Sequence, residues 1–495
     1  MAEASLSAKT LLFTHANKYG IFLRQSESKG VIVFHKHSLA PGLYAELRRL
    51  LGGEFQRQQL SVEDFDQQLS EAYERDTSEA MQIVESLGAE IDLASIANAV
   101  PETEDLLEQE GDAPIIRLIN AVLAEAIKEN ASDIHIESFE KRLVIRFRID
   151  GVLREVVQPK RELAPLLVSR LKVMAKLDIA EKRVPQDGRI SLKVAGREID
   201  IRVSTLPSNN GERVVLRLLD KQAGRLNLKS LGMPKDLLQS MSYLLRKPHG
   251  IILVTGPTGS GKTTTLYAGL SEINDSTRNI LTVEDPIEYN LEGIGQTQVN
   301  LKADMSFARG LRAMLRQDPD VVMVGEIRDV ETAEIAVQAS LTGHLVLSTL
   351  HTNTAVGAIA RLRDMGIEPF LLASSLMAIL AQRLVRVLCS HCKAPHEPSL
   401  LEKEFLGELL SKDVQLYQPV GCEHCNDLGF SGRQGIYELL VVDDNLRQLI
   451  HDKASEADIV DSVRQYAASI RSDGRQRVLD GTTTVEEVIR VTLED

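Results

Sequence analysis

A glycine-rich segment near the middle of the chain fits the pattern G-x-x-x-x-G-K-[ST]. Its residues are Gly256, Pro257, Thr258, Gly259, Ser260, Gly261, Lys262 and Thr263. A loop that wraps phosphates with backbone N–H groups needs glycines for close approach, a lysine for the terminal phosphates and a hydroxyl for Mg²⁺. The apolar run IILVT precedes the loop and the helical segment TTTLYAGLSEIN follows it, which disfavours a plain glycine-rich turn. The segment therefore predicts a nucleotide-phosphate site with bound Mg²⁺.

Acidic side chains follow two other apolar runs. Glu284 and Asp285 come directly after NILTV, and Glu326 comes after VVMV and a glycine. Nucleotide hydrolysis needs an acid near Mg²⁺ and a group that orients the attacking water. If both runs are strands of one parallel sheet, their carboxyl ends meet beside the phosphate loop. We therefore expect Glu284 and Glu326 to be catalytic, whereas either acid alone would be read as a helix cap or a surface carboxylate.

Two histidines, His344 and His351, bracket a further strand in TGHLVLSTLHTN. His351 falls at the carboxyl end of that strand, where its ring could hydrogen-bond the γ-phosphate and report its presence. We therefore include His351 among the catalytic candidates. An ordinary packing role stays open for both histidines.

The chain has four cysteines, Cys389, Cys392, Cys422 and Cys425. They form two C-x-x-C pairs, and four thiolates on two tight turns can close a tetrahedral zinc site. In a reducing compartment two disulfides are disfavoured, although redox pairs and free buried thiols remain alternatives. His391 and His424 could replace a ligand, but four cysteines already complete a closed site. We expect structural zinc and no catalysis at this metal.

The elements that must position these residues follow from hydrophobic patterning. Buried-looking strands at 250–256, 279–285, 320–326 and 344–350 are separated by longer helical segments. This order is typical of a doubly wound parallel sheet in a multidomain α/β protein. We expect that domain to span residues 235–495 and to include a zinc subdomain at 386–430.

Two α+β domains are expected before it. Residues 1–100 mix short apolar runs (IFL, VIVF) with an amphipathic helical pattern at 43–53. Residues 101–112 contain six acids and no base, which is typical of a solvated linker. Residues 113–222 combine a helical segment with the strand patterns DIHIE, RLVIRFRIDG, EIDIRVSTLP and RVVLRLLD. Residues 223–234 are expected to link this domain to the next.

Composition and charge exclude several classes of protein. The 495 residues are 43% hydrophobic and 26% charged, which argues against extended disorder, and no apolar run is long enough to cross a bilayer. The net charge of -14 disfavours nucleic acid as the main partner. Residues 113–222 carry 21 basic and 15 acidic side chains, so this segment is locally basic. That segment is either an ordinary solvated surface or one that meets anions.

The motifs resemble those of the secretion ATPase superfamily that powers type II secretion and type IV pili. GPTGSGKTTTLYA, LTVEDPIEY, LRQDPDVVMVGEIRD and LTGHLVLSTLHTN occur in the family's order, and ASDIHIE, AEKRVPQDGRI and LPSNNGERVVLRLL are similar to its preceding domain. The resemblance implies a RecA-like ATPase domain in a hexameric ring, with ATP between that domain and the one before it.

The resemblance also implies residue roles. Lys262 and Thr263 would bind phosphate and Mg²⁺, Glu284 would position or activate water, and Glu326 would act near the metal. Arginines would reach the phosphates, and the ones that match best are Arg202 and Arg217 of the preceding domain, with Arg312 and Arg316 as further contributors.

The N-terminal stretch LLFTHANKYGIFL resembles the type II branch, although Leu12 stands where a proline is common. Membership in that branch implies a cytoplasmic protein held at the inner membrane by partners. Residues 1–100 would dock on the cytoplasmic domain of a membrane-spanning L component, and the platform F component and acidic phospholipid are further expected contacts. The alternatives are a type IV pilus extension ATPase, a zinc-stabilised scaffold that binds ATP without hydrolysis, and a nucleic-acid-translocating ring.

Overall fold

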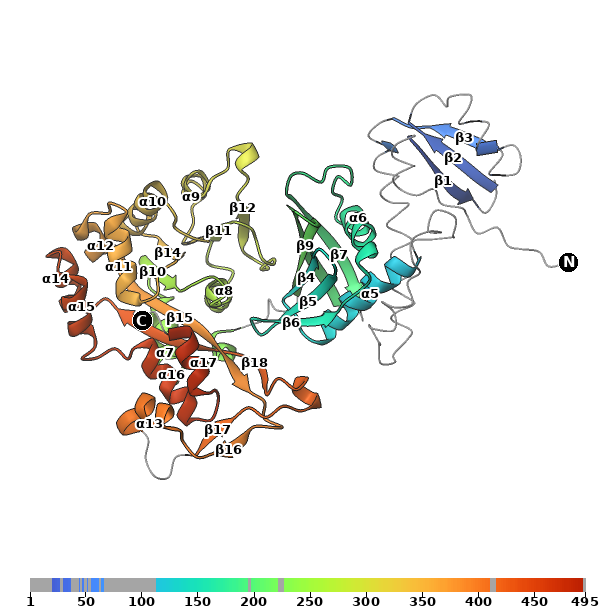
Figure 1. Cartoon of the computed structure of the whole chain (residues 1–495). Coiled ribbons are helices and arrows are strands. Elements are labelled where there is room, and N and C mark those ends of the chain that lie inside the picture. The colour runs from blue at the N-terminus through green and yellow to red at the C-terminus, as the bar shows by residue number, and fades with distance from the viewer. Residues whose placement is uncertain are drawn as a thin grey trace. The chain divides into compact units, whose positions relative to one another are not determined.

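The computed structural model describes residues 20–26, 30–36, 113–194, 197–220, 227–409 and 415–492, together with 44, 47–48, 51, 55–61 and 64–65. The chain forms two compact units, Met1–Asp220 and Lys221–Asp495 (Figure 1). The expected linker at 101–112 and most of the expected helix at 43–53 lie outside the described residues. In the described parts of the chain, no helix is long and apolar enough to cross a membrane.

The first unit begins with a three-stranded sheet in the order β1-β2-β3. Its strands are β1 (Ile21–Ser26), β2 (Gly30–His35) and β3 (Gln56–Gln59). β1 and β2 are antiparallel, and β3 lies parallel to β2. The short apolar runs IFL and VIVF lie in β1 and β2, where Ile21, Leu23 and Val33 are buried together with Leu47.

A six-stranded antiparallel sheet in the order β6-β5-β4-β9-β8-β7 lies in the later part of this unit. Its strands are β4 (Asp133–Ser138), β5 (Leu143–Ile149), β6 (Val152–Val157), β7 (Gln186–Val194), β8 (Arg197–Ser208) and β9 (Gly211–Asp220). Helices α5 (Ala113–Lys128) and α6 (Ala164–Met174) pack on one face, where Ile119, Leu167 and Ile136 line a shared apolar interior. The alternate residues of the strands form the other face, which is polar.

The second unit contains a seven-stranded sheet in the order β12-β11-β13-β14-β10-β15-β18. Its strands are β10 (Gly250–Thr255), β11 (Ile280–Glu284), β12 (Gly295–Gln298), β13 (Val321–Val324), β14 (Leu345–Leu350), β15 (Leu376–Leu388) and β18 (Phe430–Val441). The first six are parallel, as expected, and β18 runs antiparallel to β15. The sheet is therefore mixed at one edge rather than wholly parallel.

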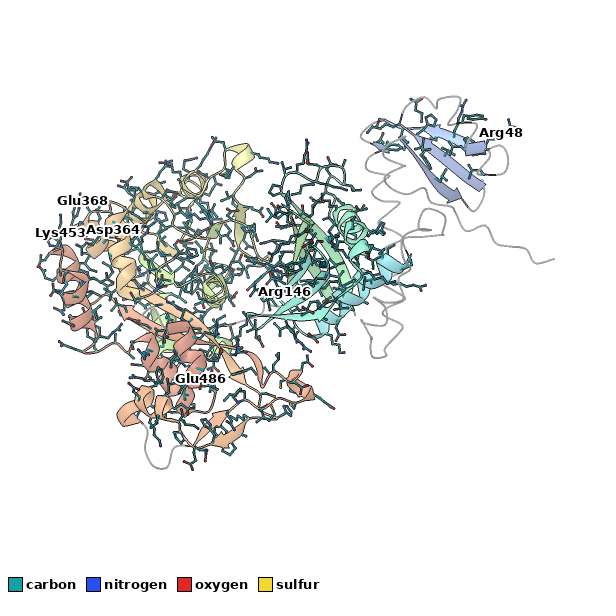
Figure 2. The ribbon with its side chains drawn as sticks, in the orientation of Figure 1. Arg48, Arg146, Asp364, Glu368, Lys453 and Glu486 are labelled. Atoms are coloured by element: carbon teal, nitrogen blue, oxygen red, sulfur yellow. The ribbon has the colours of Figure 1, made fainter. Side chains whose placement is uncertain are left out.

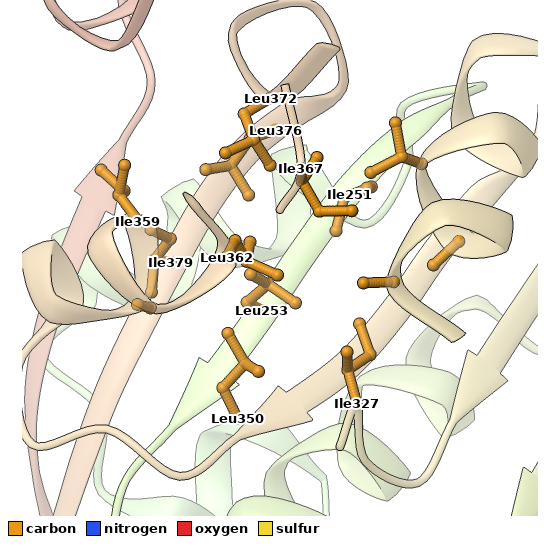
Figure 3. Close-up of a cluster of buried hydrophobic side chains, with 14 of the residues drawn as sticks. Ile251, Leu253, Ile327, Leu350, Ile359, Leu362, Ile367, Leu372, Leu376 and Ile379 are labelled. Atoms are coloured by element: carbon orange, nitrogen blue, oxygen red, sulfur yellow. The ribbon is translucent and has the colours of Figure 1, made fainter. Parts of the chain in front are cut away.

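Helices cover both faces of this sheet, so the central strands are buried on both sides. Ile251 and Leu253 of β10 face a core that also includes Ile359, Leu362 and Leu372 (Figure 3). The alternate β10 residues belong to a second core on the other face. The helices of the first core are α9 (Phe307–Met314), α10 (Val330–Leu341), α11 (Ala355–Asp364), α12 (Pro369–Ser375), α14 (Asp444–His451) and α15 (Glu456–Val463). Those of the second are α7 (Lys235–Leu244) and α8 (Lys262–Ile273).

A small module lies between β15 and β18 in sequence and contains β16 (Ala394–His396), α13 (Leu400–Leu406) and β17 (Leu416–Gln418). Figure 1 shows it at one end of the unit, near α16 (Ile470–Leu479) and α17 (Val485–Thr492). Part of the expected linker at 223–234 is described as well. Leu228–Leu231 form a short 3-10 helix whose Leu228 is buried in the core of the second unit.

Candidate active site

The glycine-rich segment connects β10 to α8, as its sequence context predicts. Gly256, Gly259 and Gly261 all have positive φ, at 151°, 80° and 88°. Side chains with a Cβ disfavour these conformations, so the glycines are required by the backbone path. Lys262 is the first residue of α8, and the loop therefore ends at a helix N-terminus. Such a terminus presents backbone N–H groups to an anion.

Lys262 is held inside this loop. Its Nζ donates to the carbonyl oxygens of Gly256 (2.7 Å) and Pro257 (3.0 Å), and the residue is 8% exposed. Burial lowers the pKa of Lys262 to about 8, with Arg383 adding to the effect and Glu326 opposing it. A phosphate group would favour the charged amine and would replace carbonyl partners with anionic ones.

The low pKa of Lys262 predicts proton uptake when ADP binds near pH 8. Above pH 8, Lys262 loses its proton when no nucleotide is bound. The affinity for Mg²⁺–ADP should therefore fall by about tenfold per pH unit, until the pH reaches the usual pKa range of lysine. The pH dependence of folding stability in protein without added nucleotide has the opposite sign. The unfolded chain binds more protons than the native state between pH 8 and that range, so the contribution of Lys262 to stability rises with pH.

Titration calorimetry in two buffers of different ionisation enthalpy measures this uptake. Lys247→Ala, at a partly exposed lysine that stacks on Tyr243 after α7, is the matched control and should leave it unchanged. An affinity that stays constant from pH 7 to 9 would contradict the prediction.

Glu284 ends β11 at the carboxyl edge of the sheet, but the residue is only 2% exposed. Its carboxylate accepts hydrogen bonds from the hydroxyls of Tyr267 and Thr282 (2.5 Å for Thr282) and from Nε2 of Gln296 (3.1 Å). Burial and the neighbouring carboxylate raise the pKa of Tyr267, which stays a neutral donor. Three protein donors thus occupy a carboxylate that, by the family resemblance, would position or activate water, and the geometry favours holding the neighbouring turn.

The same network fixes the turn that follows β11. The backbone N–H of Glu288 donates to the Tyr267 hydroxyl (3.3 Å), and Gln296 also donates to the carbonyl of Tyr289 (3.2 Å). Tyr267 and Tyr289 pack edge to face with ring centroids 4.7 Å apart. Glu288 was not selected from the sequence, although it is the second glutamate of EDPIEY and is less buried than Glu284.

Removing the Tyr267 hydroxyl is expected to destabilise this network. Tyr267→Phe leaves buried Glu284 with one donor fewer, so the free energy of unfolding should fall by about 1–3 kcal/mol. Tyr289→Phe is the matched control, because the Tyr289 hydroxyl forms no hydrogen bond with the residues that the structure describes. Chemical denaturation of the two variants measures the difference, and equal losses would show that the hydroxyl network contributes nothing.

Glu326 and His351 are brought together at the same sheet edge. Glu326 forms an ion pair with Arg328, and one of its oxygens lies 3.2 Å from Nε2 of His351. The charge of Glu326 also opposes the fall in the pKa of Lys262, a residue of the phosphate loop. The second histidine lies elsewhere. Nδ1 of His344 is 2.9 Å from the carbonyl of Ala339, at the opposite end of β14, which is a structural contact.

The candidate arginines of the first unit lie in one cross-strand row. Arg202 is directly opposite Arg217 on one side and Arg189 on the other, and Arg217 is opposite Asp133 of β4. Nε of Arg217 lies 3.0 Å from Asp133, and the Arg217 side chain is 58% exposed. Like charges directly opposite are unfavourable in a sheet, so a row of three arginines favours anion binding.

Other charged residues lie on this polar face or in the second unit. Arg146, labelled in Figure 2, forms an ion pair with Glu137 of β4 at 2.6 Å. In the second unit, Arg312 pairs with Glu331 (2.6 Å), and Arg316 donates to the Arg312 carbonyl (2.9 Å). In the structure Arg312 and Arg316 therefore contact partners other than Lys262.

The four cysteines converge, as their spacing predicts. Their sulfurs all lie within 4.8 Å of one another, with separations of 3.9 Å for Cys389–Cys422 and 3.7 Å for both Cys392–Cys425 and Cys422–Cys425. Four sulfurs at about 2.3 Å from a tetrahedral ion lie about 3.8 Å apart, so the arrangement fits zinc. It does not fit disulfides, and all four thiols are free.

Backbone donors support thiolates at this site. The N–H groups of Cys422 and Gly429 point at the sulfur of Cys425, and they lower its pKa to about 7 against burial, which raises it. His391 and His424 stack on each other with ring centroids 3.9 Å apart. Within the described residues, the four cysteines form the group that could hold a metal, and neither histidine belongs to it.

A phosphate loop between a buried parallel strand and a helix, with an acid and a histidine at the neighbouring strand ends, defines a phosphate-loop ATPase of RecA-like fold. Residues 108–490 match the family model "Type II/IV secretion system protein", and residues 10–73 match a family model for an N-terminal domain of GSPII protein E. The chain belongs to the type II secretion system protein E family of secretion ATPases.

Individual relatives agree with this assignment. The type II secretion system protein E of Pseudomonas aeruginosa is 64% identical over 100% of this chain and 98% of its own length. The type II secretion system ATPase E of Vibrio cholerae is 59% identical over 99% of this chain and 97% of its own. Among solved structures, the pilus retraction motor PilT with bound ADP is 29% identical and covers 75% of this chain and 95% of its own, with a TM-score of 0.52.

The Legionella pneumophila ATPase DotB has a TM-score of 0.57 at 22% identity, over 76% of this chain and 95% of its own. This likeness supports the fold. The full-length relatives favour the type II branch over the pilus alternative, because their similarity includes the N-terminal region.

Proposed function

We propose that this chain is the ATPase motor of a type II secretion system. It hydrolyses ATP to drive assembly of a pseudopilus and export of folded proteins from the periplasm across the outer membrane. The observation that carries the proposal is the cluster of Lys262, Glu326 and His351 around the phosphate loop, in a chain whose full length resembles type II secretion ATPases.

ATP and Mg²⁺ are the cofactors that the site would take. Backbone N–H groups of residues 256–263 and Nζ of Lys262 would bind the phosphates, and the Thr263 hydroxyl would be a Mg²⁺ ligand. Glu326 would act near the metal or orient water. His351, which contacts Glu326, would sense the γ-phosphate. Because Glu284 is enclosed by protein donors, we assign it to holding the turn that carries Glu288, which has more access to water.

We further propose a homo-hexamer whose sites are completed by arginines. Arg202 and Arg217 lie side by side on a polar sheet face, which suits the terminal phosphates of a nucleotide held by an ATPase unit. Asp133 lies 3.0 Å from Nε of Arg217 and would have to release it for Arg217 to reach a phosphate. Arginines supplied across a mobile interface act only when the ring closes, so isolated chains should be weakly active.

Membrane attachment is proposed to be peripheral and to depend on partners. The region 1–100 contains the match to the N-terminal domain of GSPII protein E, and we propose that it docks on the cytoplasmic domain of the L component at the inner membrane. The F component and acidic phospholipid are the further proposed contacts, and nucleic acid is not proposed as one. The proposed domain limits remain 1–100, 113–222 and 235–495, with the zinc subdomain at 386–430.

Zinc is proposed as a structural ion of the small module. Cys389, Cys392, Cys422 and Cys425 would hold it, and the tetrahedron that they form leaves no open position for a substrate. When bound, the ion would cross-link the two C-x-x-C turns and neutralise part of the thiolate charge.

The assignment to type II secretion is tested by deleting residues 1–100 in a strain that has both type II secretion and surface pili. We expect exoproteins to remain in the periplasm while surface pili persist, because the partner-docking region is lost. Loss of pili with secretion intact would instead identify a pilus extension motor.

A further inference from the structure

Gln382 is a buried polar residue of β15 that contacts the phosphate loop. It is 2% exposed. Its Nε2 donates to the backbone carbonyl of Ser260 (2.8 Å), and its Oε1 accepts from the hydroxyl of Thr265 (2.7 Å). A single side chain thus connects the loop backbone to the first turn of α8.

The glycines of the loop are packed against the same residue. A Cβ added to Gly256 would lie 2.5 Å from the backbone carbonyl oxygen of Gln382, and one added to Gly261 would lie 2.7 Å from the side-chain Nε2 of Gln382. Both distances are shorter than real Cβ contacts. The backbone of residue 382 at Gly256 and the side chain of Gln382 at Gly261 therefore add to positive φ in disfavouring a larger residue at these two positions.

The bond to Ser260 sets the direction of a loop N–H. The Ser260 carbonyl and the Gly261 N–H belong to one planar trans peptide, so they point in opposite directions. Gln382 holds the Ser260 carbonyl toward β15. The Gly261 N–H is therefore directed to the opposite side of the loop. Backbone N–H groups of this loop are the phosphate donors of such sites.

Neighbouring contacts hold Gln382 in place. β15 pairs with β10 next to it, with Ala381 opposite Thr255, the last residue before the loop. Arg383 donates to the carbonyls of Asn353 (2.8 Å) and Val491 (3.2 Å), so it ties β15 to the segment after β14 and to α17. The strand that carries Gln382 is thus anchored independently of the loop.

We propose that Gln382 is a positioning residue of the phosphate loop, which orients the Ser260–Gly261 peptide to receive a nucleotide phosphate. This inference rests on the proposed ATPase function. The nucleotide-bound state would gain one preorganised hydrogen-bond donor. Loss of this donor would weaken nucleotide affinity more than it lowers the turnover rate at saturating ATP.

The test compares Gln382→Met with the wild-type full chain. Methionine has a similar length and no amide, so it removes both hydrogen bonds with little change in volume. We expect Mg²⁺–ADP to bind about tenfold more weakly, which corresponds to about 1.4 kcal/mol. We also expect faster hydrogen exchange at residues 256–263, and a rise in KM for ATP that exceeds the fall in kcat.

Thr265→Val is the matched control, because it removes the bond to Oε1 and leaves the Ser260 bond. Its ADP affinity should stay within about twofold of wild type. If Gln382→Met does not fold, Gln382→Asn keeps the amide but is too short to reach both partners, and it should weaken ADP binding in the same direction.

Two outcomes separate the inference from the proposed function. A wild-type chain that fails to bind Mg²⁺–ADP overturns the ATPase proposal and this inference with it. A wild-type chain that binds ADP, with Gln382 variants that bind equally well and exchange equally slowly in the loop, overturns only the inference. A lower melting temperature with unchanged ADP affinity would likewise show a merely structural role.

Discussion

Lys262→Ala is expected to lower the rate of ATP hydrolysis by about 10²–10³-fold. The amine is held inside the loop by two carbonyl oxygens, next to the helix N-terminus that would receive the phosphates. No other lysine lies in the loop, and alanine cannot stabilise the charge that develops on the transferred phosphoryl group. Phosphate release by the assembled protein at saturating Mg²⁺–ATP measures the loss.

Lys247→Ala is the control for this experiment, since it removes an equal charge at a position outside the loop. It should retain the wild-type rate. Equal rates for Lys262→Ala and wild type would contradict the assignment of the loop as the hydrolytic site, even if ATP binds elsewhere.

Cys389→Ser is expected to abolish stoichiometric zinc binding and to destabilise the module between β15 and β18. Structural zinc contributes about 10 kcal/mol or more to small domains that depend on it, and a hydroxyl is a poor replacement for a thiolate ligand. The module is also held by the stacking of Arg386 on Phe430, with the guanidinium 4.1 Å from the ring centroid. We therefore expect local unfolding of residues 389–430 while the seven-stranded sheet persists.

Zinc content and limited proteolysis measure these effects. The double variant His391→Ala and His424→Ala is the control, because the two stacked rings lie outside the cysteine cluster. It should keep its zinc. Retention of zinc by Cys389→Ser, or free thiols and no zinc in the wild-type chain, would contradict the metal assignment.

The strands that carry the phosphate loop and the acids at their ends could be predicted because their sequences are mostly apolar. β10, β11, β13 and β14 are central parallel strands buried on both faces, and polar or glycine residues follow each run. The loop motif itself is local, so its strand, turn and helix are encoded within a short stretch.

β15 could not be predicted in the same way. Its sequence, LMAILAQRLVRVL, is apolar on both faces, and periodicity alone does not distinguish such a run from a buried helix. Its pairing with β10 and β18 decides the conformation. Because Gln382 lies on this strand, its contact with the loop could not be predicted from the sequence either.

The role of Glu284 shows a second limit. A carboxylate at the end of a parallel strand is correctly placed by sequence reasoning, but its access to water depends on neighbours from other elements. Tyr267 comes from α8 and Gln296 from β12, and together they enclose the carboxylate. Nothing in the local sequence reports those two contacts.

The arginine row of the first unit depends on register. Alternation predicts that Arg202 and Arg217 each lie on the polar face of a strand, but only strand pairing shows that they are directly opposite each other. The pairing of β4 with β9 brings Asp133 opposite Arg217, although the two residues are 84 positions apart in the sequence.

The most direct test of the proposed motor function is complementation of a strain that lacks its own type II secretion ATPase. Exoprotein released to the medium is measured for the wild-type chain and for Glu326→Gln, which keeps the shape of the side chain and removes its charge. We predict that the wild-type chain restores release and that Glu326→Gln leaves exoproteins in the periplasm at equal protein abundance. Full release with Glu326→Gln, or no release with the wild-type chain, would contradict the proposal.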